Sequence, residues 1–233
     1  MPQNTAKEIK IDIRPELNLV KQQLVTATRR VFSIPKLPKF KNLKIAFSIA
    51  KNKRALADME GVGGYCPSPK TIQISIDPDH PEFKHDPLGT VSRSLAHELY
   101  HAIRFGSGAS SPNGKLFDCA IDEGLADRFV FEELGRLPSW SKKIKHGEFN
   151  RLTAKFLRIA NCKITDSNYS DWFIKGSKRK KIPRWVGYSI GLEIVRKYQR
   201  TIRNNSVLDL IKIPASEFGN ISSKKTVAKN KVI

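Results

Sequence analysis

The distribution of apolar residues predicts two helices and two strands in the middle of the chain. Apolar side chains recur every three or four residues over 88–103 and over 116–134, which is the period of a helix with one buried face. A glycine follows each run, as is common at helix C-termini. Residues 43–49 (LKIAFSI) and 71–76 (TIQISI) are rich in β-branched residues and predict strands.

The remaining chain predicts helices on both sides of these strands. The same periodicity indicates further helices at 15–32, about 141–160, 183–202 and 206–211. Residues 61–64 (GVGG) predict a turn, and residues 161–181 predict mostly loop. One helix, a small sheet and then several helices together indicate an α+β fold with a small mixed or antiparallel sheet and a mainly helical C-terminal half.

Composition indicates a cytoplasmic globular protein. Of the 233 residues, 39% are hydrophobic, and no apolar run approaches the roughly 20 residues that a membrane-spanning helix needs. The N-terminal residues lack the apolar core of a signal peptide. The three cysteines are widely spaced, which favours reduced thiols over a disulfide framework or a cysteine metal site.

Charge is unevenly distributed along the chain. The formal net charge is +20, yet residues 77–133 contain eleven acidic and five basic residues. An acidic segment is therefore embedded in a basic protein. The excess positive charge indicates either a solubilising surface or attraction to nucleic acid, an anionic membrane or an acidic protein partner.

The first predicted helix carries the sequence HELYH at residues 97–101. On a helix, His97 and His101 lie one turn apart, with about 6 Å between their β-carbons, so both imidazoles can reach one metal ion. Glu98 lies beside them and can act on water polarised by that metal. This HExxH pattern is typical of zinc hydrolases. The alternative is a chance match, on the order of one in a hundred for such a chain, on an ordinary amphipathic helix.

The next helix supplies candidates for the rest of the site. A catalytic zinc ion normally takes three protein ligands and leaves a position for water. Glu123, in the sequence IDEGLAD, is the best candidate for the third ligand. Asp127 follows one turn later and is suited to hold the outer nitrogen of His97.

HELYHAIRF followed by IDEGLADRF resembles the gluzincin metallopeptidases, the group that includes thermolysin. More closely, it resembles a family of predicted zinc-dependent proteases, and this likeness runs from about Gly61 to about Val195. The resemblance implies a zincin-like metallopeptidase domain with one zinc ion bound by His97, His101 and Glu123. It also implies that Asp127 supports the ligands. Tyr188, in a Tyr-x-x-Gly setting, would stabilise the oxyanion, or alternatively anchor the start of its helix.

On this basis we expect zinc-dependent hydrolysis of peptide bonds, with Glu98 as general base. The strand at 71–76 would be the sheet edge that pairs with an extended substrate. We expect three parts: an N-terminal segment with one helix (1–40), the peptidase domain (41–215) and a basic, flexible tail (216–233). The rival is a basic protein that binds nucleic acid or another anionic partner and has a structural or inactive metal site.

Other residues of reactive type have simpler interpretations. Tyr100 lies off the ligand face of its helix, which indicates a structural role. His146 is expected to be a surface residue rather than an oxyanion donor. Cys119 precedes Glu123 by one turn and is expected to pack in the core. The histidines at 80 and 85 have no partner at metal-ligand spacing.

Overall fold

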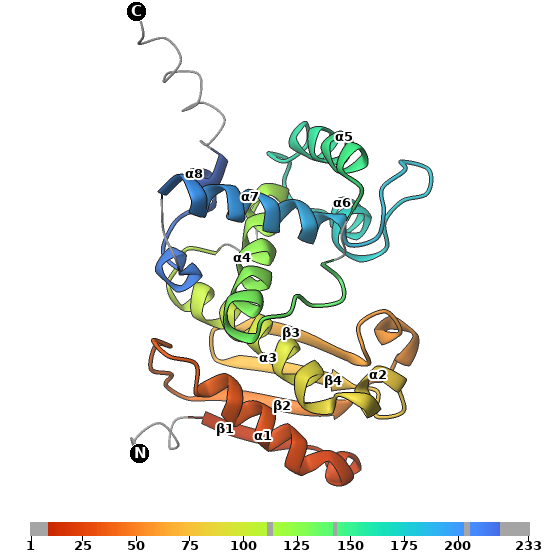
Figure 1. Cartoon of the computed structure of the whole chain (residues 1–233), viewed down its shortest axis with the longest axis vertical. Helices are drawn as coiled ribbons and strands as arrows, with labels where there is room; N and C mark the ends of the chain where they lie inside the picture. Colours follow the sequence, from red (N-terminus) through yellow and green to blue (C-terminus); the bar gives the residue numbers. More distant parts are fainter. Residues whose placement is uncertain (1–8, 111–113, 142–143, 203–205, 220–233) are drawn as a thin grey trace, which may run out of the picture. The chain divides into compact units, whose positions relative to one another are not determined.

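The computed structural model describes residues 9–110, 114–141, 144–202 and 206–219. The chain forms two compact units (Figure 1). Unit 1 comprises residues 1–106 and 129–140, and unit 2 comprises residues 107–128 and 141–233. The expected division at residues 40 and 215 stays a prediction. Most of the expected tail, residues 220–233, lies outside the described part of the chain.

Unit 1 contains a four-stranded mixed sheet in the order β1-β2-β4-β3. Strands β1 (Ile9–Ile13), β2 (Leu43–Ile49) and β4 (Thr71–Ile76) are parallel neighbours, and β3 (Val62–Ser68) runs antiparallel to β4. The ranges predicted for β2 and β4 are confirmed. The small sheet, expected to be mixed or antiparallel, is mixed.

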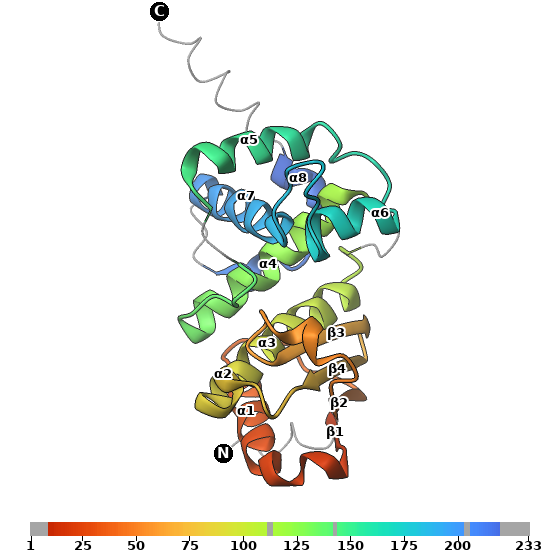
Figure 2. The same ribbon diagram turned by 90° about the vertical axis from the view of Figure 1, so that its right-hand side faces the viewer.

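Two helices pack on this sheet, α1 (Lys21–Phe32) and α3 (Pro87–Gly106). Figure 2 shows both helices on the same side of the strands. Alternate residues of the central strands are buried because they face this layer, and the helices bury apolar residues in turn. Strands β2 and β4 and helices α1 and α3 all contribute to the buried core of unit 1. Their buried apolar residues include Ile45, Phe47, Ile72, Ile74, Leu24, Val31, Leu95 and Leu99.

Short helical segments connect these elements in unit 1. They are η1 (Pro15–Val20), η2 (Lys53–Leu56) and α2 (Pro81–His85). The helix predicted at 15–32 is thus a 3-10 turn followed by α1. In α2, the ring of His80 caps the helix, because Nδ1 accepts a hydrogen bond from the backbone N–H of Glu82 at 3.2 Å.

Two expectations about the sheet are wrong. The GVGG sequence was expected as a turn, but Val62, Gly63 and Gly64 begin strand β3. The reason is close packing: a β-carbon on Gly63 would lie 2.7 Å from the side chain of Leu56. The strand at 71–76 is also not the sheet edge, because β4 lies between β2 and β3. The edge strand on that side is β3.

Unit 2 is helical. Its main helices are α4 (Leu116–Leu134, which continues into unit 1), α5 (His146–Leu157) and α7 (Val186–Ile202). Shorter segments are α6 (Asp166–Tyr169), the π-helical turn η3 (Ser170–Ile174), η4 (Val207–Leu210) and α8 (Ala215–Gly219). Phe156, Trp172, Phe173 and Ile190 are central members of its core. The α+β class with a mainly helical C-terminal half is confirmed.

The helix predicted from Pro183 begins three residues late. Lys181 and Trp185 both have positive φ angles, 50° and 62°, so the chain cannot follow a right-handed helix through this segment. The guanidinium group of Arg184 lies 3.9 Å from the centroid of the Trp185 ring and covers it. Helix α7 therefore starts at Val186.

Among the described residues, no helix is both long enough and apolar enough to cross a membrane.

Candidate metal centre

Helix α3 presents two imidazole rings to one point. His97 and His101 are buried, with 3% and 8% of their surface exposed, and their Nε2 atoms lie 3.1 Å apart. Two nitrogen ligands of one tetrahedral zinc ion, each about 2.0–2.1 Å from the metal, would lie roughly 3.3 Å apart. The rings are nearly perpendicular, at 78°, so both nitrogens converge without the rings clashing. The helical spacing predicted from the sequence is thus realised.

Glu123 on α4 completes a group of three buried metal-ligating residues. One ligand atom from each of His97, His101 and Glu123 can be chosen so that all lie within 4.8 Å of one another. Two imidazole nitrogens and one carboxylate oxygen are a donor set that fits zinc and leaves a coordination position for water. The group is composed of exactly the three residues proposed as ligands from the sequence.

Glu98 lies against strand β3, opposite a residue that has no side chain. A β-carbon at Gly64 would lie 2.4 Å from Cγ of Glu98 and 2.6 Å from its Oε1. The carboxylate of Glu98 therefore occupies the space that any larger residue at position 64 would fill. Only 8% of the surface of Glu98 is exposed. This role of Gly64 was not predicted from the sequence, although the adjacent glycines in GVGG were the available signal.

The buried residue Cys66 lies close enough to Glu98 to be affected by its charge. Burial and the charge of Glu98 raise the pKa of Cys66 to about 12. Its thiol donates a hydrogen bond to the backbone carbonyl of Ser68 at 3.2 Å. Cys66 is therefore a neutral thiol at physiological pH, and it is not available as a thiolate ligand or nucleophile.

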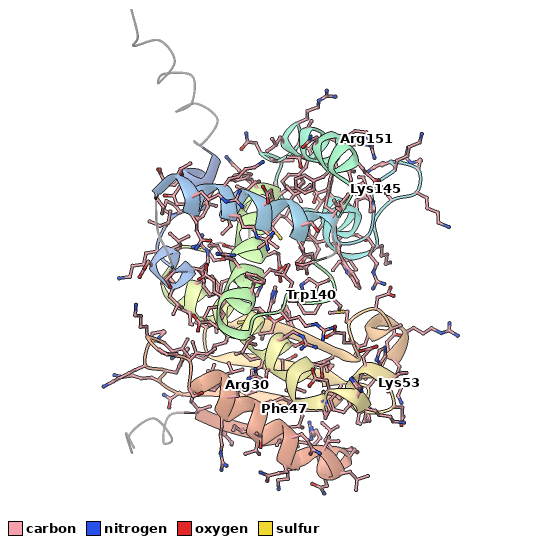
Figure 3. The ribbon with its side chains drawn as sticks, viewed as in Figure 1. Arg30, Phe47, Lys53, Trp140, Lys145 and Arg151 are labelled. Carbon is pink, nitrogen blue, oxygen red and sulfur yellow. The ribbon has the colours of Figure 1, made fainter. Side chains whose placement is uncertain are left out.

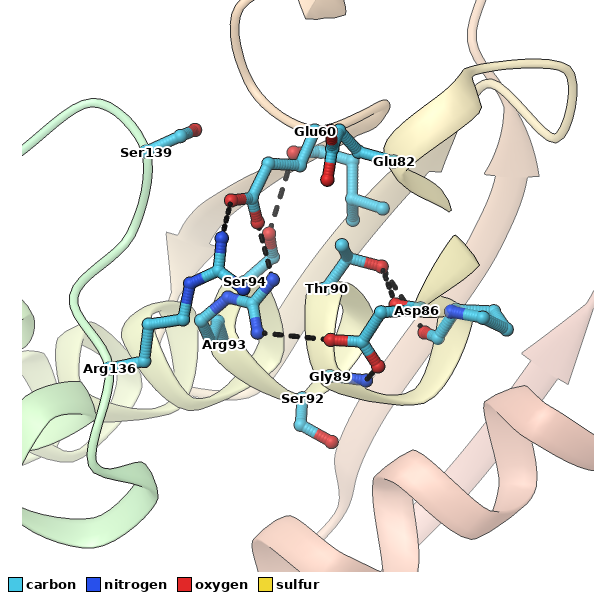
Figure 4. A network of polar contacts seen from close by, with 12 residues as sticks. Glu60, Glu82, Asp86, Gly89, Thr90, Ser92, Arg93, Ser94, Arg136 and Ser139 are labelled. Atoms are coloured by element: carbon cyan, nitrogen blue, oxygen red, sulfur yellow. Dashed lines mark hydrogen bonds and ion pairs between the residues drawn. The ribbon is translucent and has the colours of Figure 1, made fainter. Parts of the chain in front are cut away.

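An ion-pair network braces α3 one turn before the first ligand (Figure 4). Arg93 donates to Glu60 at 2.5 Å and to Asp86 at 3.4 Å, and Arg136 donates to the other oxygen of Glu60 at 3.0 Å. Arg93 and Glu60 are largely buried, so loss of one partner would leave a buried charge uncompensated. The network ties the segment before β3 to the helix that carries His97.

Aromatic rings surround the two histidines in unit 1. The Trp140 ring meets His97 edge-on, with centroids 5.3 Å apart, and Phe105 stacks on His101 at 6.1 Å. Trp140 is labelled in Figure 3 and has only 6% of its surface exposed. Sequence reasoning missed Trp140, because it lies in a segment without regular periodicity. Tyr100 packs on Phe129 within the core, in agreement with a structural role.

Asp127 is fully buried on α4, one turn after Glu123. Its carboxylate accepts a hydrogen bond from the hydroxyl of Ser141. A buried carboxylate held in this way has a fixed orientation, as a residue that supports a metal ligand requires. Its expected interaction with His97 stays a prediction.

Tyr188 lies in the first turn of α7, in unit 2 together with Glu123. Burial, followed by the charge of Glu123, raises the pKa of the Tyr188 hydroxyl well above its ordinary value. The hydroxyl therefore stays protonated at neutral pH and can donate a hydrogen bond. Its ring also packs on Phe173, with centroids 5.8 Å apart, so the position serves the unit 2 core as well.

Helices α4 and α7 cross at two glycines. A β-carbon on Gly191 would lie 1.7 Å from the carbonyl oxygen of Ala120, and one on Gly124 would lie 2.2 Å from the carbonyl carbon of Gly191. The backbones can touch only because both residues lack side chains. Gly124 follows Glu123 directly, and Gly191 lies one turn after Tyr188, so this crossing fixes the backbones that carry these two candidate residues relative to each other.

Comparison with known proteins agrees with this arrangement. A family model described as "Predicted Zn-dependent protease (DUF2268)" matches residues 18–220, which include the metal-ligating residues, Glu98 and Tyr188. The chain belongs to this family. The match extends over strands β2, β3 and β4 and over helices α3, α4 and α7, whereas β1 precedes it.

One relative is the "Uncharacterized protein YjaZ" of Bacillus subtilis (strain 168). It is 29% identical over 134 residues, which are 56% of this chain and 50% of the relative. The alignment thus spans about half the length of that protein. No solved structure matches.

Among the described residues, the other candidates considered from the sequence are not members of the His97, His101 and Glu123 group. His80 caps α2 and its Nε2 lies 3.0 Å from the carbonyl oxygen of Ala57. Burial, followed by the charge of Glu123, raises the pKa of Cys119 well above its ordinary value, and the residue packs against the unit 2 core as expected. The side chain of His146 lies outside the described part of the structure.

Proposed function

We propose that this chain is a zinc-dependent metallopeptidase that hydrolyses peptide bonds. The observation that carries the proposal is the buried group of His97, His101 and Glu123, whose ligand atoms lie within 4.8 Å of one another. A glutamate adjacent to the first histidine completes the set of groups that metal-assisted hydrolysis requires. Membership of a family of predicted zinc-dependent proteases supports the same activity.

His97, His101 and Glu123 would hold the zinc ion. When bound, zinc lowers the pKa of a coordinated water molecule toward about 7 and acts as a Lewis acid. The carboxylate of Asp127, oriented by Ser141, would hold a ligand histidine in the correct tautomer. The rings of Trp140 and Phe105 limit access of bulk water to the histidines.

Glu98 would act as the general base. It would accept a proton from the attacking water and pass that proton to the leaving amine. This role requires the carboxylate to keep one orientation, which the close approach of Gly64 favours. Tyr188, which stays protonated because its pKa is raised, would donate a hydrogen bond to the oxyanion of the tetrahedral intermediate.

The substrate would pair with strand β3. This strand is the outer strand next to β4, and its residue Gly64, which has no side chain, lies against Glu98 on α3. An extended peptide can add to such an edge through backbone hydrogen bonds. Because these bonds involve only the backbone, this mode of binding tolerates many different substrate side chains. This arrangement replaces the strand at 71–76 that was expected to serve as the edge.

The variant Glu98→Gln tests the base directly. It removes the proton acceptor but keeps the shape of the side chain and all three metal ligands. We expect zinc content equal to that of the wild type and at least about a hundredfold loss of peptidase activity on an unfolded protein substrate. Zinc is measured by elemental analysis of the same preparation that is assayed. Unchanged turnover in Glu98→Gln would remove Glu98 from the mechanism.

The rival function, an anionic-partner-binding protein with an inactive metal site, gives a different result. Wild-type protein would then bind no zinc, or would bind zinc and show no hydrolysis that a chelator abolishes. The peptidase predicts hydrolysis that is lost on chelation and restored by added zinc.

A further inference from the structure

Helix α5 and the hairpin at 175–184 form a continuous surface of unit 2. Ser177 and Ile182 exchange backbone hydrogen bonds of 2.8 and 2.9 Å across the hairpin. The ammonium group of Lys155 on α5 donates to the backbone carbonyl of Lys180 at 2.6 Å. These bonds hold the hairpin against the helix, so the outward side chains of both belong to one surface.

This surface is strongly basic. Lys175, Lys178, Arg179 and Lys181 are exposed, and they form no salt bridge with any residue that the structure describes. Two acidic side chains of these segments are already engaged, since Asp171 pairs with Lys180 and Glu148 pairs with Arg151. Arg151 is labelled on α5 in Figure 3. The exposed cations that we call the basic face are Arg151, Arg158, Lys175, Lys178, Arg179 and Lys181.

Two aliphatic side chains are exposed among these cations. Leu157 at the end of α5 is 51% exposed, and Ile174 before the hairpin is 40% exposed. Their sequence neighbours Phe156 and Phe173 pack together in the core, with ring centroids 6.5 Å apart. Leu157 and Ile174 therefore each directly follow a residue of one core contact, and each is adjacent in sequence to a cation of the basic face.

We propose that the basic face binds the anionic headgroups of a lipid bilayer surface, with Leu157 and Ile174 inserted at the level of the headgroups. Clustered lysines and arginines attract anionic lipid, and exposed aliphatic side chains add apolar contact with the bilayer. Proteins that bind single-stranded nucleic acid instead stack bases on exposed aromatic rings. The exposed large hydrophobic residues in the described part of unit 2 are Leu157, Ile174 and Ile202, and all three are aliphatic. Exposed cations together with exposed aliphatic side chains therefore favour lipid over single-stranded nucleic acid.

The test is binding of the full chain to vesicles. Sedimentation with phosphatidylcholine vesicles, with and without about 30% phosphatidylglycerol, measures the partition coefficient. We expect binding only to the anionic vesicles and its loss when salt rises from about 0.05 to 0.5 M. Each removed cation should weaken binding roughly fivefold, so the triple variant Lys178→Gln, Arg179→Gln, Lys181→Gln should bind about a hundredfold more weakly.

A matched variant separates the basic face from net charge. Lys39→Gln, Lys41→Gln, Lys51→Gln removes three exposed cations of unit 1 and lowers the net charge by the same amount. It should bind anionic vesicles within about twofold of the wild type. Equal loss in both triple variants would overturn the proposal, because binding would then follow net charge alone. Circular dichroism and melting temperature confirm that both variants are folded.

A third variant separates lipid from other polyanions. Leu157→Gln with Ile174→Gln keeps every charge and should weaken vesicle binding roughly tenfold. Binding of an oligonucleotide, followed by fluorescence anisotropy, should be unchanged in this variant and weaker than vesicle binding in the wild type. Tight oligonucleotide binding without vesicle binding would contradict the proposal. Unaltered vesicle binding in the double variant would contradict it too.

Discussion

The two units position their candidate catalytic groups by different means. In unit 1, His97, Glu98 and His101 lie within five residues of one helix, so the helical repeat sets most of their geometry. In unit 2, Glu123 and Tyr188 come from separate helices, and a crossing of two glycines fixes their relation. The helical repeat thus places the residues of a local motif, with Gly64 of β3 leaving room for Glu98, whereas the placement of Glu123 and Tyr188 depends entirely on close packing between segments distant in sequence.

The largest expected effect compares the buried thiol of Cys66 and the half-buried thiol of Cys119 with the exposed thiol of Cys162. Cys66 and Cys119 lie near Glu98 and Glu123 respectively, and both have raised pKa values because burial and a nearby carboxylate disfavour the thiolate. Cys162 is exposed. At pH 8 a pKa of about 12 leaves roughly one Cys66 molecule in ten thousand as thiolate.

Iodoacetamide should therefore alkylate Cys162 at least about a thousandfold faster than Cys66 in the folded chain. Because the pKa of Cys66 is raised, its labelling should increase about tenfold per pH unit up to about pH 12. Mass spectrometry of peptides after timed labelling measures these rates, and the unfolded chain is the control. Rapid labelling of native Cys66 would show that the environment of Glu98 is open to solvent.

The next effect tests the unit 1 arrangement through the backbone. Gly64→Ala places a methyl group 2.4 Å from Cγ of Glu98, so the carboxylate must move. A displacement of about 1 Å in a catalytic group can cost on the order of a hundredfold in rate. We expect such a loss in kcat, with zinc content preserved because no metal ligand changes.

Gly147→Ala is the matched control for this prediction. Gly147 lies in α5, and an added β-carbon meets no atom within 4 Å. Its activity and zinc content should equal those of the wild type. Full activity in Gly64→Ala would show that the contact between β3 and Glu98 does not matter for turnover.

A smaller effect tests the crossing in unit 2. Gly191→Ala forces the backbones of α4 and α7 apart, because its β-carbon would meet the carbonyl oxygen of Ala120. Overpacking of this kind costs about 2 kcal/mol in free energy of unfolding. Urea denaturation measures that cost, and a zinc titration should show weaker binding because Glu123 lies on α4. Wild-type stability and zinc affinity together would mean that the crossing does not position Glu123.

The parts of the fold that could be predicted from the sequence are those with a clear side-chain periodicity, in both units. Strand β4, the C-terminal end of α3 and the whole of α4 were predicted well, because side-chain periodicity reports directly which face is buried. Strand β3 was missed because Gly63 and Gly64 carry no side chain and so leave no alternating pattern. Those glycines are required by contacts with Leu56 and Glu98, which are distant in sequence.

Some residues of the candidate site could likewise be predicted from the sequence, and others could not. Three of its residues follow from HExxH spacing, and Glu123 follows from its place on the next helix. Trp140 could not be predicted, because it reaches His97 from a segment with no regular structure. The need for Gly124 beside Glu123 was equally hidden, since it arises from the backbone of α7.

The central claim is that His97, His101 and Glu123 bind one zinc ion. The most direct measurement is metal analysis of the purified chain, combined with anomalous diffraction at the zinc absorption edge. We predict one zinc per chain, with an anomalous peak surrounded by these three side chains, and much weaker zinc binding in Glu123→Ala. Full zinc content in Glu123→Ala, or a peak at other residues, would contradict the account.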